Sequence, residues 1–183
     1  LKSMRAAPAL RRILGDRGED HIWRMYAAES LGKIRDPEAV AVLKQVFAEN
    51  DPLLKAYAAS ALAHFDLSQV IDILMEALKD SHWKVRVAAC QGLSRPDASP
   101  AVEILIYKVE KDPEMKVKTE AIKALGAIGT ERAFSFLRTL IQDTGKPTPL
   151  RAFAFQTLVE KNLSGETLAA IEKLIAAEWE TKD

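Results

Sequence analysis

The sequence has one cysteine, three histidines and no excess of charge, and each scarcity removes a class of function. Cys90 alone cannot form a disulfide within the chain, and it cannot build a thiolate-rich metal site. The 26 basic and 26 acidic residues cancel, which disfavours a binder of the phosphate backbone of nucleic acids. No apolar run is long enough to span a membrane and no secretory signal is present, so we expect a cytoplasmic protein without membrane insertion.

The sequence also lacks the short motifs that mark catalytic sites. It contains no glycine-rich phosphate loop, no nucleophile elbow and no zinc-binding dyad. His21, His64 and His82 occupy unrelated places within the repeats described below, so they are not expected to converge on a metal. Cys90 shares its repeat position with apolar or small residues, which indicates packing. We therefore predict no enzyme activity, no catalytic residue, no metal and no cofactor.

A repeated pattern fills the chain instead. In each copy an apolar residue precedes a basic one, an alanine follows three residues after the basic position, and a leucine follows four residues after the alanine. The copies are spaced by 31 to 33 residues. The basic column consists of Arg24, Lys55, Arg86, Lys118 and Arg151. Spacing this regular indicates one structural unit used five times.

Each copy reads as a hairpin of two helices. The apolar residue, the alanine and the leucine follow the i, i+4, i+8 spacing of one helix face. A second amphipathic stretch follows a short turn, at about 39–47, 70–78, 101–109, 133–141 and 170–175. Asp36-Pro37, Asp51-Pro52 and Asp112-Pro113 are predicted to open helices with a capping carboxylate. No stretch alternates with a period of two, so we predict an all-α fold without a sheet.

The order Asp-Pro, Val-Arg or Val-Lys, Ala-Ala and Leu-Gly at this period resembles HEAT repeats, most closely the short bacterial type named after phycobilisome lyases. The resemblance covers residues 18 to 180. It implies a right-handed α-solenoid, in one domain over 1–183. We expect a leading helix at 6–15 and repeats at about 18–50, 51–79, 80–111, 112–145 and 146–180. Residues 8–14 look like the second helix of a repeat without its first, so we also expect a fragment of a longer protein.

The resemblance implies a protein-binding scaffold, with two alternatives. The first is an accessory subunit or lyase-like protein that holds a substrate protein or a bilin chromophore. The second is a HEAT-like nucleic-acid binder or DNA glycosylase, which Trp83 could suggest, although no basic groove accompanies it. HEAT-like deoxyhypusine hydroxylases bind iron through His-Glu pairs, whereas Ile22, Phe65 and Trp83 follow the histidines here. That enzyme class is not expected.

Partner binding is expected on the second helices, which line the concave face in structures of the family. The predicted partner-binding residues are Lys44, Asp72, Met75, Glu76, Glu103, Ile106, Tyr107 and Arg138. Met75, Ile106 and Tyr107 would form an apolar spot with a charged rim, which is typical of a binding hot spot. Alternatively, Met75 and Ile106 pack between adjacent repeats. The expected partner is a protein or peptide; nucleic acid is disfavoured, and a monomer is the default oligomeric state.

Two further expectations concern the first helices. The basic column is predicted to be structural, with heads that reach turn carboxylates such as Asp36, Asp66 and Asp97. The alternative is a ladder of cations that binds an anion. Trp23 stands in the apolar column with Leu54 and Val85, and is therefore predicted to lie in the core.

Overall fold

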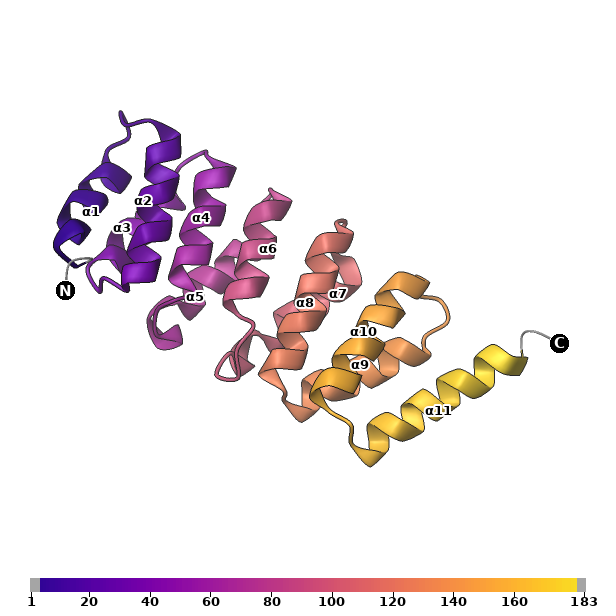
Figure 1. The fold of residues 1–183 in the computed structure, drawn as a ribbon. Coiled ribbons are helices and arrows are strands. Elements are labelled where there is room, and N and C mark those ends of the chain that lie inside the picture. Colours follow the sequence, from indigo (N-terminus) through magenta and orange to yellow (C-terminus); the bar gives the residue numbers. More distant parts are fainter. Residues whose placement is uncertain (1–3, 181–183) are drawn as a thin grey trace. The chain divides into compact units, whose positions relative to one another are not determined.

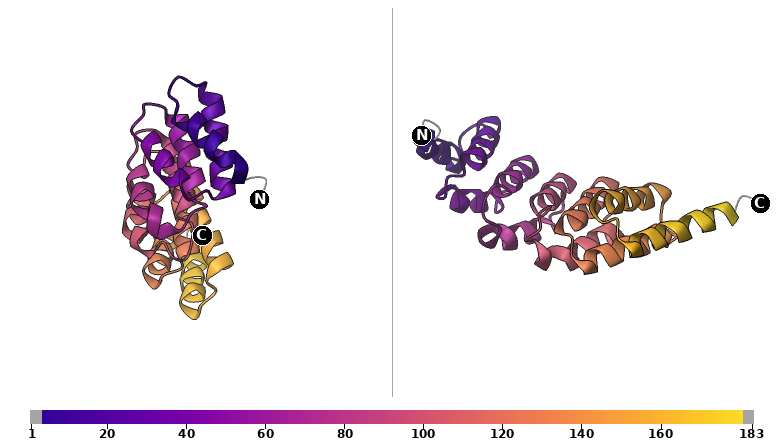
Figure 2. Two further views of the ribbon diagram at one scale, coloured as in Figure 1. Left: turned by 90° about the vertical axis from the view of Figure 1, so that its left-hand side faces the viewer. Right: turned by 60° about the horizontal axis from the view of Figure 1, so that its bottom comes forward.

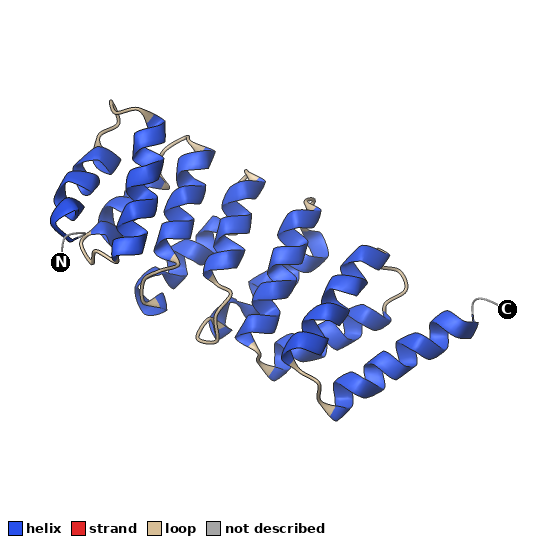
Figure 3. Ribbon diagram, in the orientation of Figure 1, coloured by secondary structure: helices blue, strands red, loops and turns tan. Residues whose placement is uncertain are grey.

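The computed structural model describes residues 4–180, with side chains described as far as residue 176. The described residues form α-helices and two short 3-10 helices and include no strand (Figure 1, Figure 3). The prediction of an all-α fold is confirmed. The chain divides into two compact units, Leu1–Leu93 and Ser94–Asp183. The division falls inside the third predicted repeat.

Unit 1 is a stack of helices in two layers. Its elements are η1 (Met4–Ala6), α1 (Ala7–Gly15), α2 (His21–Ile34), α3 (Ala39–Val46), α4 (Pro52–Leu62), α5 (Leu67–Ala77) and α6 (Trp83–Gly92). The first helices α2, α4 and α6 pack side by side, and α1, α3 and α5 form the second layer behind them (Figure 2). The α2–α3 and α4–α5 pairs are two of the predicted hairpins.

Unit 2 repeats this arrangement. Its elements are η2 (Ser99–Ala101), α7 (Val102–Lys111), α8 (Met115–Ile128), α9 (Glu131–Gln142), α10 (Thr148–Lys161) and α11 (Gly165–Glu180). The first helices α8 and α10 pack against each other, while α9 packs against both α7 and α11. The α8–α9 and α10–α11 pairs are predicted hairpins, and the remaining one, α6–α7, has one helix in each unit.

The alanine and leucine columns form the core of each unit. All five leucines of the column are fully buried, namely Leu31, Leu62, Leu93, Leu125 and Leu158. The alanines are at most 1% exposed at Ala27, Ala58, Ala89, Ala121 and Ala154. A small side chain in the middle of the stripe allows neighbouring first helices to approach closely. At Gly32, an added Cβ would lie only 2.7 Å from the Cα of Ala61 on α4.

The predicted helix starts are correct at one Asp-Pro pair and wrong at two. Asp51 caps α4, because its carboxylate accepts hydrogen bonds of 3.0 Å from the amides of Leu53 and Leu54. In contrast, α3 begins at Ala39 and α8 at Met115, beyond the predicted starts. Asp36 and Asp112 are buried, and a buried carboxylate needs compensating donors.

Neither carboxylate is the capping residue of the helix that follows it. Asp36 pairs with Arg11 of α1 at 3.3 Å. Asp112 accepts the amide of Glu114 at 3.1 Å and lies 3.4 Å from the Lys108 ammonium. The Asp-Pro signal therefore marks the turn correctly but misplaces the first helical residue.

Trp23 is not in the core, so that prediction is wrong. Its side chain is 63% exposed, whereas Leu54 and Val85 at the same repeat position are fully buried. Both α4 and α6 pack against a first helix that precedes them, α2 and α4 respectively. Among the described residues no first helix precedes α2, so the face that carries Trp23 and Tyr26 stays exposed.

The basic column ties four of the five first helices to the second helix before each of them. Four members donate hydrogen bonds of 2.8 to 3.3 Å to backbone carbonyls at or just after the C-terminus of that second helix: Arg24 to Leu14, Arg86 to Asp80 and Ser81, Lys118 to Glu110, and Arg151 to Ile141. A cation here also meets the negative end of the helix dipole. Lys55 differs, because its ammonium pairs with Asp80 at 3.1 Å.

The carboxylate partners differ from those predicted. Asp36 pairs with Arg11 and Asp97 with Arg95, rather than with members of the basic column. Arg24 instead forms a two-bond pair with Glu49, at 2.7 and 2.8 Å.

Candidate functional site

A groove runs between the second helices α7 and α9 of unit 2. It has a volume of about 410 Å³. Its lining consists of Glu103, Ile106, Tyr107, Glu110, Arg132, Ser135, Phe136 and Thr139. Tyr107 is 58% exposed, whereas Ile106 is almost buried at 7% and forms part of the groove floor. The helical period places Glu103, Tyr107 and Glu110 on one face of α7, so one ridge carries an aromatic ring between two carboxylates.

An ion pair connects the two helices at one end of the groove. The Arg132 guanidinium donates to both carboxylate oxygens of Glu103, at 2.7 and 3.1 Å. These hydrogen bonds lower the pKa of Glu103 and raise that of Arg132. A bidentate pair fixes the orientation of both planar groups. It therefore holds a rigid rim at this end of the groove.

The groove continues into a smaller cavity of about 100 Å³ between α7, α9 and the start of α10. The two spaces share Glu110, Phe136 and Thr139, and the smaller one adds Asp143 and Lys146 at its mouth. Among the described residues the Glu110 carboxylate has no cationic partner within 4 Å. It is therefore available to a donor that approaches along the groove.

The structure brings together only some of the predicted partner-binding residues. Glu103, Ile106 and Tyr107 line the groove, but Arg138 does not. The Arg138 side chain is 12% exposed and pairs with Glu131 and, at 2.8 Å, with Glu166 of α11. It therefore connects α9 with α11.

The other predicted residues lie on α3 and α5 of unit 1. The Lys44 ammonium donates to the carbonyl of Gln69 at 2.7 Å, and Glu76 pairs with Lys79 at the same distance. Asp72 is exposed and Met75 is half-buried. Since Met75 belongs to unit 1, its predicted association with Ile106 and Tyr107 in one apolar spot stays a prediction.

Sequence reasoning missed Arg132, Glu110 and Phe136. Phe136 falls within the amphipathic stretch predicted at about 133–141, but it is half-buried and lines the groove. Arg132 and Glu110 lie outside the columns that were compared between repeats. The spacing of Glu103 and Arg132, 29 residues, is close to the repeat period, and this could have indicated a contact between successive second helices.

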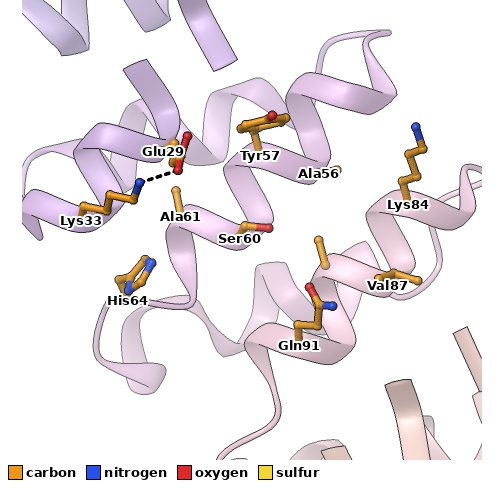
Figure 4. A pocket seen from close by; sticks show the side chains of 11 residues that line it. Glu29, Lys33, Ala56, Tyr57, Ser60, Ala61, His64, Lys84, Val87 and Gln91 are labelled. Carbon is orange, nitrogen blue, oxygen red and sulfur yellow. Dashed lines mark hydrogen bonds and ion pairs between the residues drawn. The ribbon is translucent and has the colours of Figure 1, made fainter. Parts of the chain in front are cut away.

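A second groove lies on the first helices of unit 1, where no site was predicted. It has a volume of about 390 Å³ and is lined by Glu29, Lys33, Ala56, Tyr57, Ser60, Ala61, His64, Lys84, Val87, Ala88 and Gln91 (Figure 4). The small side chains of α4 and α6 leave this space unfilled, and Tyr57 is part of its lining. Glu29 and Lys33 pair with each other on the α2 side.

The described residues contain no cluster of histidine, cysteine and carboxylate side chains that could hold a metal ion. Cys90 is fully buried in unit 1. Within residues 4–180, no helix combines the length and the apolar character needed to cross a lipid bilayer.

Three solved structures with a similar fold are distant in sequence. An engineered protein matches with a TM-score of 0.61 and 17% identity, covering 93% of this chain and 95% of its own. A designed armadillo repeat protein in complex with the peptide (KR)4 matches with a TM-score of 0.58 and 15% identity, covering 93% of this chain and 98% of its own. Human deoxyhypusine hydroxylase in complex with glycerol matches with a TM-score of 0.55 and 21% identity, covering 92% of this chain and 66% of its own. At these identities the likeness shows the fold alone.

The sequence comparison identifies the family. None of the curated proteins matches the sequence. The family described as Spirochaete HEAT repeat protein matches residues 1–183, which is the whole sequence. Together with the stacked helical hairpins of both units, this match shows that the chain belongs to the spirochaete HEAT repeat proteins.

Proposed function

We propose that this protein is a non-catalytic scaffold that binds a protein or peptide along the second helices of unit 2. The observation that carries the proposal is the groove between α7 and α9, in which Tyr107 stands exposed beside the unpaired Glu110. An aromatic ring above an almost buried apolar floor, with a charged rim, has the composition of an interaction hot spot.

The length of the groove favours an extended or helical segment of a partner protein over a small molecule. The groove and the smaller cavity share one wall, so together they follow α7 and α9 from Glu103 to the loop at Lys146. Donors of a partner backbone or side chain could reach Glu110 and Thr139, while Tyr107 covers apolar side chains. The designed armadillo repeat protein of similar fold was solved with a peptide, and we propose the same class of partner here.

Photo-crosslinking from the groove tests this proposal. A photoreactive phenylalanine analogue in place of Tyr107 should crosslink to one partner protein in cells of the source organism. The matched control places the same analogue at Met115, which is 41% exposed on the first helix α8. Adding Glu110→Lys to the Tyr107 probe should reduce the crosslinked product several-fold. Equal products from Tyr107 and Met115, or no product from Tyr107, would overturn the proposed site.

A further inference from the structure

The groove of unit 1 is rich in hydrogen-bond donors and has a floor of small apolar residues. Ala61 of α4 and Ala88 of α6 are buried, and Ser60 of α4 is exposed. Lys84 has no carboxylate partner within 4 Å among the described residues. The single carboxylate of the lining, Glu29, is already paired with Lys33 (Figure 4). The Lys84 ammonium lies 5.8 Å from the centre of the Trp83 ring, so the groove offers a positive charge without a carboxylate partner beside an apolar floor.

Helix α11 carries a complementary face. Thr167 and Ala170 are buried on its inner side, where α11 packs against α9. On the opposite side Leu168 is 48% exposed and Ile175 is 51% exposed, with the exposed Glu172 between them. Spacings of four and three residues place these three side chains on one face. Among the described residues Glu172 has no cationic partner within 4 Å.

We propose that the unit 1 groove binds this outer face of α11 from a second copy of the chain. The dimensions agree. The groove lining on α6 runs from Lys84 to Gln91 and the α11 face runs from Leu168 to Ile175, each about 10 Å of helix at 1.5 Å per residue. A helix laid in the groove places its two large aliphatic side chains over small residues, in the manner of ridges packing into grooves.

Charge complementarity selects this occupant. The lining contributes Lys84 and the Glu29–Lys33 pair, a net positive charge, and the outer face of α11 contributes Glu172 between two aliphatic residues. A carboxylate that approaches Lys84 and the Tyr57 hydroxyl finds donors without displacing an existing ion pair. The same face would repel a second copy of itself, so the contact joins two different surfaces.

Such a contact is heterologous: the groove of one copy takes α11 of the next. In a dimer formed this way, one copy keeps an unused groove and the other keeps an unused α11. Further copies can therefore add, and association continues beyond a dimer unless the copies close into a ring. This property separates the inferred contact from a two-fold symmetric dimer. It is also independent of the α7–α9 groove, so the two proposals can fail separately.

Two exposed positions allow each surface to be blocked without disturbing the fold. Ser60→Glu puts a carboxylate into the groove, opposite the approaching Glu172, and Ile175→Lys removes one aliphatic contact of α11. Both variants should keep the helical circular dichroism and melting temperature of the wild type. Met115→Lys is the matched control, because Met115 is an exposed apolar residue outside both surfaces.

Sedimentation equilibrium over a concentration series reaching about 1 mM measures the association. We expect wild type and Met115→Lys to form species larger than a dimer. Ser60→Glu and Ile175→Lys should each raise the dissociation constant at least about tenfold. An equal mixture of these two variants restores one intact groove and one intact α11, so it should form a dimer and nothing larger.

Three outcomes would overturn the inference. They are a monomeric wild type throughout the series, unchanged association in both single variants, and a mixture of the two blocked variants that stays monomeric while the wild type associates. The last outcome would show that the two surfaces do not bind each other.

Discussion

At the scale of single residues, Arg24 shows how the basic column stabilises the fold. Its side chain is 6% exposed and donates to the carbonyl of Leu14 and to both oxygens of Glu49. The hydrogen bond from Arg24 lowers the pKa of Glu49, burial opposes the shift, and the charges of Arg24 and Arg17 add to it. The same hydrogen bond raises the pKa of Arg24. The pair should therefore make the stability of unit 1 depend on pH.

Glu49→Gln should remove this pH dependence. At neutral pH the variant leaves the buried guanidinium without its anion, which should lower the free energy of unfolding by about 1–3 kcal/mol. Because the pKa of Glu49 is lower in the folded than in the unfolded protein, its contribution is complete above the ordinary value of 4.5 and is lost as the pH falls through the folded value. Urea denaturation between neutral pH and pH 3 measures the difference.

The control for that experiment is Glu76→Gln. The Glu76 side chain is 66% exposed in its pair with Lys79, and solvent-screened pairs contribute little to stability. We expect the difference between wild type and Glu49→Gln to shrink below pH 4.5, while Glu76→Gln stays close to wild type throughout. A constant difference for Glu49→Gln down to pH 3 would contradict the role of the carboxylate charge.

Individual residues were predictable where the repeat alone decides their environment. The buried leucine and alanine columns follow from periodicity, because every copy meets the same neighbours. Trp23 and Asp36 were not predictable in this way. The exposure of Trp23 depends on which helix stands beside α2, and the burial of Asp36 depends on Arg11, which lies in the leading segment outside the repeat register. A neighbouring residue that occurs beside only one repeat leaves no signal when equivalent positions are compared between repeats.

At the scale of helices, the close approach of α8 and α10 depends on a missing side chain. A Cβ added at Gly126 would lie 2.2 Å from the Cγ2 methyl of Thr157, well inside van der Waals contact. Gly126→Ala should therefore lower the free energy of unfolding by about 1–3 kcal/mol through overpacking, despite the better helix propensity of alanine. Thr157→Ser removes the clashing methyl and should recover most of the loss in a double-mutant cycle.

Gly165→Ala is the control for the helix-packing prediction. An added Cβ at this position meets no atom within 4 Å, so the substitution should leave stability unchanged or slightly raised. Chemical denaturation of the four variants gives the comparison. A Gly126→Ala protein as stable as wild type would show that the two helices separate without cost.

Helix number, helix order and the packing of hairpins were predictable from the repeat, but the two grooves were not. A groove depends on the sizes of side chains that different repeats place side by side. The α7–α9 groove combines Tyr107 with Phe136 and a bidentate Glu103–Arg132 pair. The unit 1 groove needs alanine or serine on α4 and α6 at once. Comparing equivalent positions identifies the residues that all repeats share, whereas each groove is formed by side chains that differ between repeats.

At the scale of the whole molecule, the division at Leu93 and Ser94 predicts where cooperative unfolding stops. Repeat proteins are stabilised by contacts between neighbours, so a local defect spreads only as far as those contacts carry it. The division separates α6 from α7, the two helices of one repeat. We therefore expect each unit to open as its own cooperative segment.

Gly32→Ala tests this expectation, because the new Cβ would lie 2.7 Å from the Cα of Ala61 and backbone cannot move aside as a side chain does. Native-state hydrogen exchange should show faster exchange, by roughly fivefold or more for a cost of about 1–3 kcal/mol, in α2, α4 and α6. Exchange in α8, α9 and α10 should stay at the wild-type rate. Gly126→Ala should give the reverse pattern. If either substitution accelerates exchange equally in all six helices, the chain unfolds as one cooperative body and the division has no energetic meaning.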